Sequence, residues 1–220
     1  FNYQSVKLAK EVTPKNCYVF GLVSSSNPDW LEPVGNMTHD EVYNGYREQV
    51  LPMVEAGVDG IFVSGNHIDE SVIAIKVAKD HSDIPVLAAT VFYAGKKGFR
   101  TMTGLDPKAA SAKLQEAGAD VVGFNCGLMT KSLDASEWYP AATILLKEMK
   151  QGTDKYLLAL PDAGLAQLIN DRTVYPASPG EMASEVLNWV DVGARIVGGC
   201  CGTSIEHGRQ VSAVLRDRKA

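Results

Sequence analysis

The sequence lacks long apolar runs, basic clusters and a dense set of cysteines. No uninterrupted apolar run reaches the ~20 residues of a membrane span, and no basic segment with a short apolar core opens the chain. We therefore expect neither a span nor a signal peptide. The 220 residues include 26 Asp and Glu against 21 Lys and Arg, and this acidic balance argues against nucleic acid or a membrane surface as a partner. The length suits one domain, which we expect to cover residues 1–220.

Cysteine is scarce, and its positions exclude two common motifs. The chain has four cysteines and no Cys-x-x-Cys pair, so a zinc ribbon and a thioredoxin-type site are excluded. Without a secretory signal, four cysteines do not make a disulfide scaffold; they indicate intracellular thiols and a cytoplasmic protein. Cys17 and Cys126 stand alone, whereas Cys200 and Cys201 are adjacent. We interpret Cys17, near the start of a predicted strand, as a small core residue.

Short segments rich in Val, Ile, Leu and small residues recur along the chain. They are apolar nearly throughout instead of alternating in polarity, which is typical of strands buried on both faces of a parallel sheet. The six predicted strands cover residues 17–23, 58–64, 84–92, 119–126, 156–160 and 194–201.

Helix signals separate these strands. Thr38 with Glu41, and Ser178 with Glu181, fit the capping box, in which two side chains satisfy each other's free backbone amides. A glycine that can end a helix in a left-handed conformation precedes three of the strands. These glycines are Gly57, Gly118 and Gly193.

Strands that start about 35 residues apart predict successive right-handed βα units and therefore an α/β fold. A closed (β/α)8 barrel of the TIM type has eight such units in ~250 residues. Six are visible here, and residues 1–12 form a helical pattern ahead of the first strand. We expect a TIM-type barrel whose two N-terminal units are missing from this sequence. An open doubly wound sheet is the alternative.

Residues with useful chemistry follow several of the predicted strands. Active sites of barrels lie at the C-terminal strand ends, which places Cys126, Cys200 and Cys201 on one face. Three thiolates with one open position suit a catalytic Zn2+. Single buried thiols that fill the core, and a redox pair at positions 200 and 201, are the alternatives. Asn125, Asn66 and His67 end strands too and are candidate substrate contacts.

The motifs around these cysteines resemble a known family. Gly123-Phe124-Asn125-Cys126 is similar to the Gly-x-Asn-Cys motif of the homocysteine S-methyltransferases, and residues 198–203 (GGCCGT) match their Gly-Gly-Cys-Cys-Gly-Thr signature. Pro161-Asp162-Ala163-Gly164 stands where the family usually has Pro-Asn-Ala-Gly, and Gly65 stands nearest a family Glu that holds the amino group of homocysteine. The resemblance runs over essentially the whole chain.

This resemblance implies an enzyme in which Cys126, Cys200 and Cys201 bind Zn2+, with no catalytic residue beyond these ligands. It further implies methyl transfer to a thiol acceptor, homocysteine giving methionine, from a sulfonium, betaine-like or methyl-corrinoid donor.

Two other functions stay open from the residues alone. The glycine-rich segment 198–203 ahead of a helix is also typical of phosphate-binding barrel aldolases and isomerases. Alternatively, the chain is a binding module or barrel subunit without independent activity. It could then assemble as a homo-oligomer or with a complementing polypeptide, since six strands leave two open edges.

Overall fold

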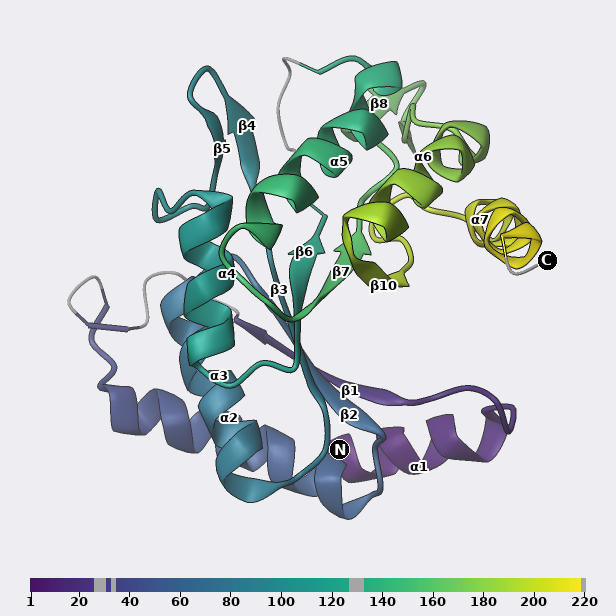
Figure 1. Ribbon diagram of the computed structural model, residues 1–220. Coiled ribbons are helices and arrows are strands. Elements are labelled where there is room, and N and C mark those ends of the chain that lie inside the picture. Colours follow the sequence, from purple (N-terminus) through teal and green to yellow (C-terminus); the bar gives the residue numbers. More distant parts are fainter. Residues whose placement is uncertain (26–30, 33–34, 127–132, 219–220) are drawn as a thin grey trace. The chain divides into compact units, whose positions relative to one another are not determined.

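Strands and helices alternate along the chain (Figure 1). The computed structural model describes residues 1–25, 31–32, 35–126 and 133–218. Six parallel strands pair in the order β1-β2-β3-β6-β7-β10. They are β1 (Phe20–Ser25), β2 (Gly60–Gly65), β3 (Val86–Thr90), β6 (Val121–Asn125), β7 (Tyr156–Leu160) and β10 (Ala194–Val197). Because neighbours in this sheet follow chain order and helices connect them, the predicted α/β fold of six βα units is confirmed.

Within the described residues, seven helices occupy the segments between and around these strands. They are α1 (Asn2–Val12), α2 (His39–Glu55), α3 (Ile68–His81), α4 (Pro107–Glu116), α5 (Ala135–Lys150), α6 (Pro179–Val192) and α7 (Ile205–Asp217). The capping boxes predicted at Thr38 and Ser178 are present, and Asp134 forms another at the start of α5. Within the described part of the chain, no helix is both long enough and apolar enough to cross a membrane.

The chain divides into two compact units. The first contains residues 1–90 and 113–122, and it holds β1, β2 and β3 with the helices α1, α2 and α3. Val63 of β2 lies between Val23 of β1 and Ala88 of β3, and none of the three side chains is exposed. Burial along the whole of β3 matches its uninterrupted apolar sequence.

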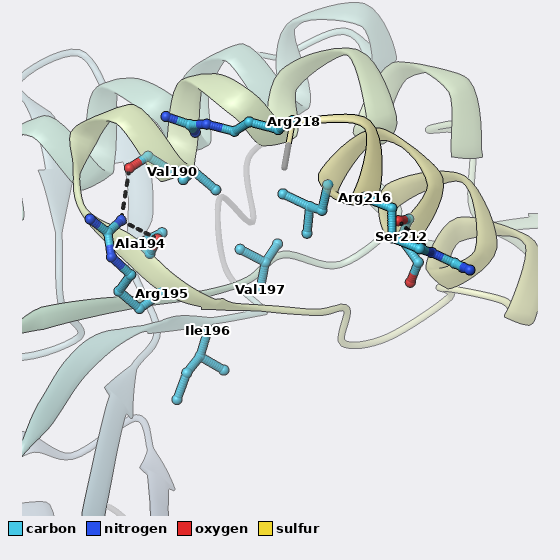
Figure 2. A pocket seen from close by; sticks show the side chains of 9 residues that line it. Val190, Ala194, Arg195, Ile196, Val197, Ser212, Arg216 and Arg218 are labelled. Atoms are coloured by element: carbon cyan, nitrogen blue, oxygen red, sulfur yellow. Dashed lines mark hydrogen bonds between the residues drawn. The ribbon is translucent and has the colours of Figure 1, made fainter. Parts of the chain in front are cut away.

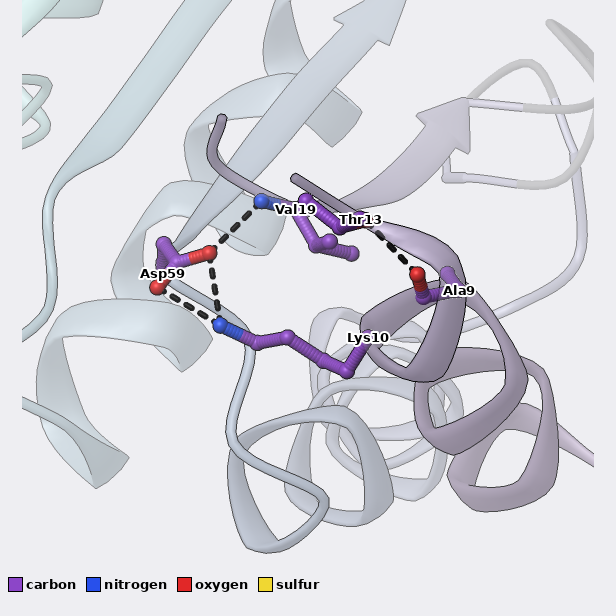
Figure 3. A network of polar contacts seen from close by, with 5 residues as sticks. All are labelled: Ala9, Lys10, Thr13, Val19 and Asp59. Carbon is purple, nitrogen blue, oxygen red and sulfur yellow. Dashed lines mark hydrogen bonds and ion pairs between the residues drawn. The ribbon is translucent and has the colours of Figure 1, made fainter. Parts of the chain in front are cut away.

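An arrangement that we call the aspartate joint occurs twice in this unit: one carboxylate accepts hydrogen bonds from a helix lysine and from the backbone at the start of a strand. Figure 3 shows the first of them. The carboxylate of Asp59 accepts both the Lys10 ammonium (2.7 Å) and the backbone N–H of Val19 (2.6 Å). The same contacts recur two βα repeats later, where Asp120 accepts Lys79 (2.6 Å) and the N–H of Val86 (2.8 Å). Each aspartate follows a helix-ending glycine by two residues, so one sequence signal both ends a helix and anchors the neighbouring strand.

The second unit contains residues 91–112 and 123–220. In it β7 pairs with β10, and helices α5, α6 and α7 pack in succession. Tyr139 and Trp189, both fully buried, join α5 to α6 with ring centroids 6.0 Å apart. Gly123 allows β6 to approach β7, because a Cβ at this position would overlap the backbone carbonyl of Leu158.

Two β-hairpins were not predicted. They pair β4 (Tyr93–Gly95) with β5 (Gly98–Arg100), and β8 (Gln167–Ile169) with β9 (Arg172–Val174). Asn170 and Asp171 form the second turn with φ values of 50° and 57°, the geometry of a type I′ hairpin turn. An Asn-Asp pair between two short apolar runs is a signal that could have identified this hairpin.

The third place where a glycine ends a helix just before a strand, at Gly193, differs from those at Gly57 and Gly118. Two residues after the glycine it has Arg195 instead of an aspartate. Its guanidinium donates to the carbonyls of Val190 (3.2 Å) and Ala194 (3.1 Å) and lies 5.8 Å from the ring centre of Tyr156. Arg195 also borders an open groove of about 860 Å³ between β10, α6 and α7 (Figure 2). No cysteine is among the nine described residues that line this groove, so it is separate from the thiols considered next.

Candidate metal centre

Three of the four cysteines come together in the second unit. Cys126 directly follows β6, and Cys200 and Cys201 follow β10 after two glycines. Strand β7 lies between β6 and β10 and holds both segments by its C-terminal end. The backbone N–H of Cys126 donates to Leu160 O (2.9 Å), that of Cys200 to Pro161 O (2.8 Å), and that of Ala163 to Cys201 O (2.9 Å). The parallel sheet therefore brings together residues that are 75 positions apart.

The three sulfur atoms have the spacing of a metal-binding set. All lie within 4.8 Å of one another, with 3.4 Å between the Sγ atoms of Cys126 and Cys201 and 3.9 Å between those of Cys200 and Cys201. Tetrahedral zinc with Zn–S bonds of about 2.3 Å requires sulfurs about 3.8 Å apart. Cys201 is exposed and the other two are half-buried, so solvent reaches the set from one side.

Local backbone geometry lets adjacent cysteines face the same point. In a regular strand Cys200 and Cys201 would point to opposite faces. Here the chain turns, since Gly202 has a φ of +76° and the Thr203 hydroxyl donates to the Cys200 carbonyl (2.7 Å). Cys126 itself has a φ of 50°, a conformation that non-glycine residues seldom adopt and that concentrates at functional sites.

The thiols influence one another's ionisation. Hydrogen bonding from Cys126 lowers the pKa of Cys200 to about 6, and the same contact raises the pKa of Cys126. The neighbouring thiol thus favours the thiolate form of Cys200. Thiolate is the form of cysteine that binds metals.

A buried carboxyl lies on the segment that supports the cysteines. Asp162 is 4% exposed and accepts a hydrogen bond from the indole Nε1 of Trp138 (2.5 Å). Burial raises its pKa to about 7, and the nearby charge of Cys200 acts in the same direction. Trp138 was not identified from the sequence, because nothing in the spacing indicates that an α5 side chain reaches this loop.

The structure places the predicted substrate contacts in different units. Asn125 precedes Cys126 in the second unit, and its buried Oδ1 atom has no hydrogen-bond partner among residues 1–25, 31–32, 35–126 and 133–218. Asn66 and His67 belong to the first unit, where His67 is the N-cap of α3 and its carbonyl accepts from Ser71 (2.9 Å).

Two residues outside the thiol set have structural positions of their own. His207 is buried, and its ring contacts the Ser204 amide (3.0 Å) and the Ala177 carbonyl (3.3 Å), so it has a structural role at the start of α7. The interpretation of Cys17 as a core residue was wrong. The strand begins only at Phe20, and Cys17 lies exposed in the preceding segment.

The glycines of the loop that carries the cysteines make room for protein atoms. A Cβ at Gly198 would lie 2.8 Å from Leu160 Cδ2, and Cβ atoms at Gly199 and Gly202 would overlap Thr203 and the ring of Tyr175. Phosphate-binding loops use glycine to leave their backbone amides open to a ligand. The packing around these glycines therefore gives no support to the phosphate-binding alternative.

Comparisons with known proteins agree with these motifs. The family model "Homocysteine S-methyltransferase" matches residues 1–215. Methionine synthase of Mycobacterium leprae is 27% identical over 217 residues, which cover 95% of this chain and 17% of that protein. The chain thus spans about one sixth of the length of this curated relative.

Solved structures show the same fold. The homocysteine methyltransferase MmuM from Escherichia coli in its apo form gives a TM-score of 0.71 at 16% identity, covering 97% of this chain and 73% of that chain. Its metallated form gives 0.66 at 16% identity, covering 96% and 65%. This likeness supports the predicted barrel type of fold. Because the family model covers nearly the whole sequence, the chain belongs to the homocysteine S-methyltransferase family.

Proposed function

We propose that this chain binds one Zn2+ through Cys126, Cys200 and Cys201 and transfers a methyl group to the thiol of homocysteine, giving methionine. The observation that carries the proposal is the convergence of three thiols, with sulfur spacings of 3.4 and 3.9 Å, at the C-terminal ends of β6 and β10. Sulfur ligands favour zinc over magnesium or calcium. Three protein ligands with solvent access on one side leave a fourth position for the acceptor.

The proposed chemistry is activation of a thiol. A free alkyl thiol has a pKa near 8.5, so only a small fraction is nucleophilic thiolate at neutral pH. When bound, zinc supplies the Lewis acid that lets the acceptor lose its proton at this pH. The exposed side of Cys201 leaves the approach for that acceptor open, and Asn125, the residue before Cys126, carries a buried Oδ1 that the described residues leave without a donor.

Family membership supports homocysteine as the acceptor, and the methyl donor is a separate proposal. A sulfonium, a betaine-like quaternary ammonium and a methyl-corrinoid all carry an activated methyl group that a thiolate can displace. The relative from Mycobacterium leprae is a methionine synthase about six times longer than the matched region, which supports a donor delivered by a partner module. Assays with all three donor classes, with and without candidate partner modules, distinguish these options.

Zinc stoichiometry of the purified chain tests the proposal. We expect about one zinc per chain in the wild type, and less than a tenth of that in Cys126→Ser, Cys200→Ser and Cys201→Ser. Cys17→Ser is the matched control, because Cys17 is an exposed thiol outside the set, and it should retain full zinc. Full zinc content in the Cys200→Ser variant, or methyl transfer to homocysteine by metal-free protein, would contradict the proposal.

A further inference from the structure

An aromatic ring lies directly on the turn that carries two of the thiols. Tyr175 follows β9, and a Cβ on Gly202 would overlap its ring atoms Cγ, Cδ1 and Cδ2. The ring therefore occupies the space next to Gly202, the residue after Cys201. Burial at this position raises the pKa of Tyr175, and the next largest influence is the charge of Cys201.

Backbone hydrogen bonds fix the segment that carries this ring. The N–H of Ala177 donates to the Ala163 carbonyl (2.9 Å), and the N–H of Ala163 donates to the Cys201 carbonyl (2.9 Å). Gly164, with a φ of +92°, makes space for Pro176, whose ring carbons would lie 3.0 Å from a Cβ there. Backbone hydrogen bonds thus connect the segment 175–177 to the loop after β7, and that loop to the cysteine turn.

The cysteine turn needs such support from outside. Cys201 is exposed, and Gly202 has no side chain with which to pack. Glycine also has the largest conformational freedom to lose when a turn becomes ordered. The Thr203 hydroxyl holds the Cys200 carbonyl from within the turn, whereas the Tyr175 ring covers it from another segment.

We propose that Tyr175 is a positioning residue for the thiol set: its ring, packed on Gly202, keeps the Cys200–Cys201 turn in the conformation that brings Cys201 within 3.4 Å of Cys126. The metal readout of this proposal rests on the proposed function, since it concerns how the same three thiols hold zinc. Residues that support metal ligands from behind commonly contribute 10- to 100-fold to metal affinity.

Zinc release to a chromogenic chelator tests this role. Tyr175→Ala should release zinc roughly 10- to 100-fold faster than the wild type, and Tyr175→Phe, which retains the ring, should release it at the wild-type rate. Tyr156→Ala is the matched control, because Tyr156 is 61% exposed and begins β7, whereas the thiols are held at the other end of that strand. Equal release rates in the wild type and Tyr175→Ala would overturn the proposal.

A double substitution tests the contact itself. Gly202→Ala alone should accelerate zinc release, because its methyl group displaces the ring. Because Gly202 has a φ of +76°, alanine is strained there with or without the ring. When Tyr175→Ala is already present, adding Gly202→Ala should therefore still accelerate release, but by less than it does in the wild type. Effects that multiply independently in the double variant would show that ring and glycine do not act through one contact.

A metal-free measurement separates this inference from the proposed function. Diamide takes up the two thiol hydrogens as it joins Cys126 and Cys201 in a disulfide, and the rate reports how often the two sulfurs meet. We expect joining to be roughly tenfold slower in Tyr175→Ala, with an unchanged urea midpoint for the metal-free chain, while an unchanged joining rate would overturn the inference. If the wild type binds no zinc and the joining rates of wild type and Tyr175→Ala still differ by about tenfold, the proposed function is contradicted and the positioning role is supported.

Discussion

Glu70 is a carboxyl group buried without full hydrogen bonding. Its side chain is 1% exposed, and one oxygen accepts a hydrogen bond from the Tyr46 hydroxyl (3.2 Å). The other oxygen has no partner among the residues that the structure describes. Burial raises the pKa of Glu70, because the charged form loses its hydration. The first unit thus carries a group whose ionisation opposes folding.

The sign of this effect gives a testable pH dependence. The folded state binds the Glu70 proton more tightly than the unfolded state, so the free energy of unfolding should fall as pH rises from about 4.5 through the raised pKa. The side chain that Glu70→Gln introduces cannot ionise, so the variant should lack this part of the pH dependence. Between pH 4 and pH 7 its free energy of unfolding should therefore fall less than that of the wild type. Urea unfolding of the metal-free chain at several pH values measures the difference.

Asp69 provides the matched control for this measurement. It precedes Glu70 in the first turn of α3, and its exposed carboxylate pairs with Lys113. Asp69→Asn should leave the Glu70 slope in place. A Glu70→Gln variant with the same pH profile as the wild type would show that Glu70 is hydrated in solution.

At the scale of elements, the aspartate joints hold helices to strand starts. Removing Asp59 leaves the Val19 amide and the Lys10 ammonium without their acceptor. We expect Asp59→Ala to lower the free energy of unfolding by about 1–3 kcal/mol, as is usual when a charged hydrogen-bond partner is lost. Asp191→Ala removes only an exposed pair with Arg218 and should cost less than about 1 kcal/mol. Equal losses in the two variants would contradict the anchoring role.

Substitution by alanine should have opposite effects on stability at Gly123, in the sheet, and at Gly45, in a helix. A methyl group at Gly123 would overlap the Leu158 carbonyl between β6 and β7, so Gly123→Ala should destabilise by about 1–3 kcal/mol or more. Gly45, inside α2, has open space around it, and Gly45→Ala should stabilise by about 0.5–1 kcal/mol. Thermal unfolding of both variants checks the prediction. Destabilisation by Gly45→Ala would show that α2 is packed more closely at this point.

Most elements could be predicted because their signals are local. The uninterrupted apolar runs identified all six sheet strands. The predicted start of β1 was three residues too early, and the predicted β10 was four residues too long. The Thr38 and Ser178 caps fixed two helix starts. The two hairpins were missed because each strand has three residues, too few to show a period, and because one turn is built on Lys96 and Lys97.

For the molecule as a whole, the thiol set was predictable and its surroundings were not. Cys126, Cys200 and Cys201 follow strands of one parallel sheet, so their convergence follows from topology. The ring of Tyr175 on Gly202 and the Trp138–Asp162 hydrogen bond depend on how loops and helices pack, which no spacing in the sequence encodes. The division into two units likewise reflects contacts between distant segments.

The central claim is a three-sulfur zinc site with a fourth position for a thiol acceptor. Zinc K-edge X-ray absorption of the zinc-loaded chain tests it most directly, with spectra recorded alone, with homocysteine and with homoserine, its oxygen analogue. We predict three sulfur neighbours at about 2.3 Å, a fourth sulfur on adding homocysteine, and no gain with homoserine. A shell dominated by nitrogen and oxygen, or a sulfur count that homocysteine leaves unchanged, would contradict the account.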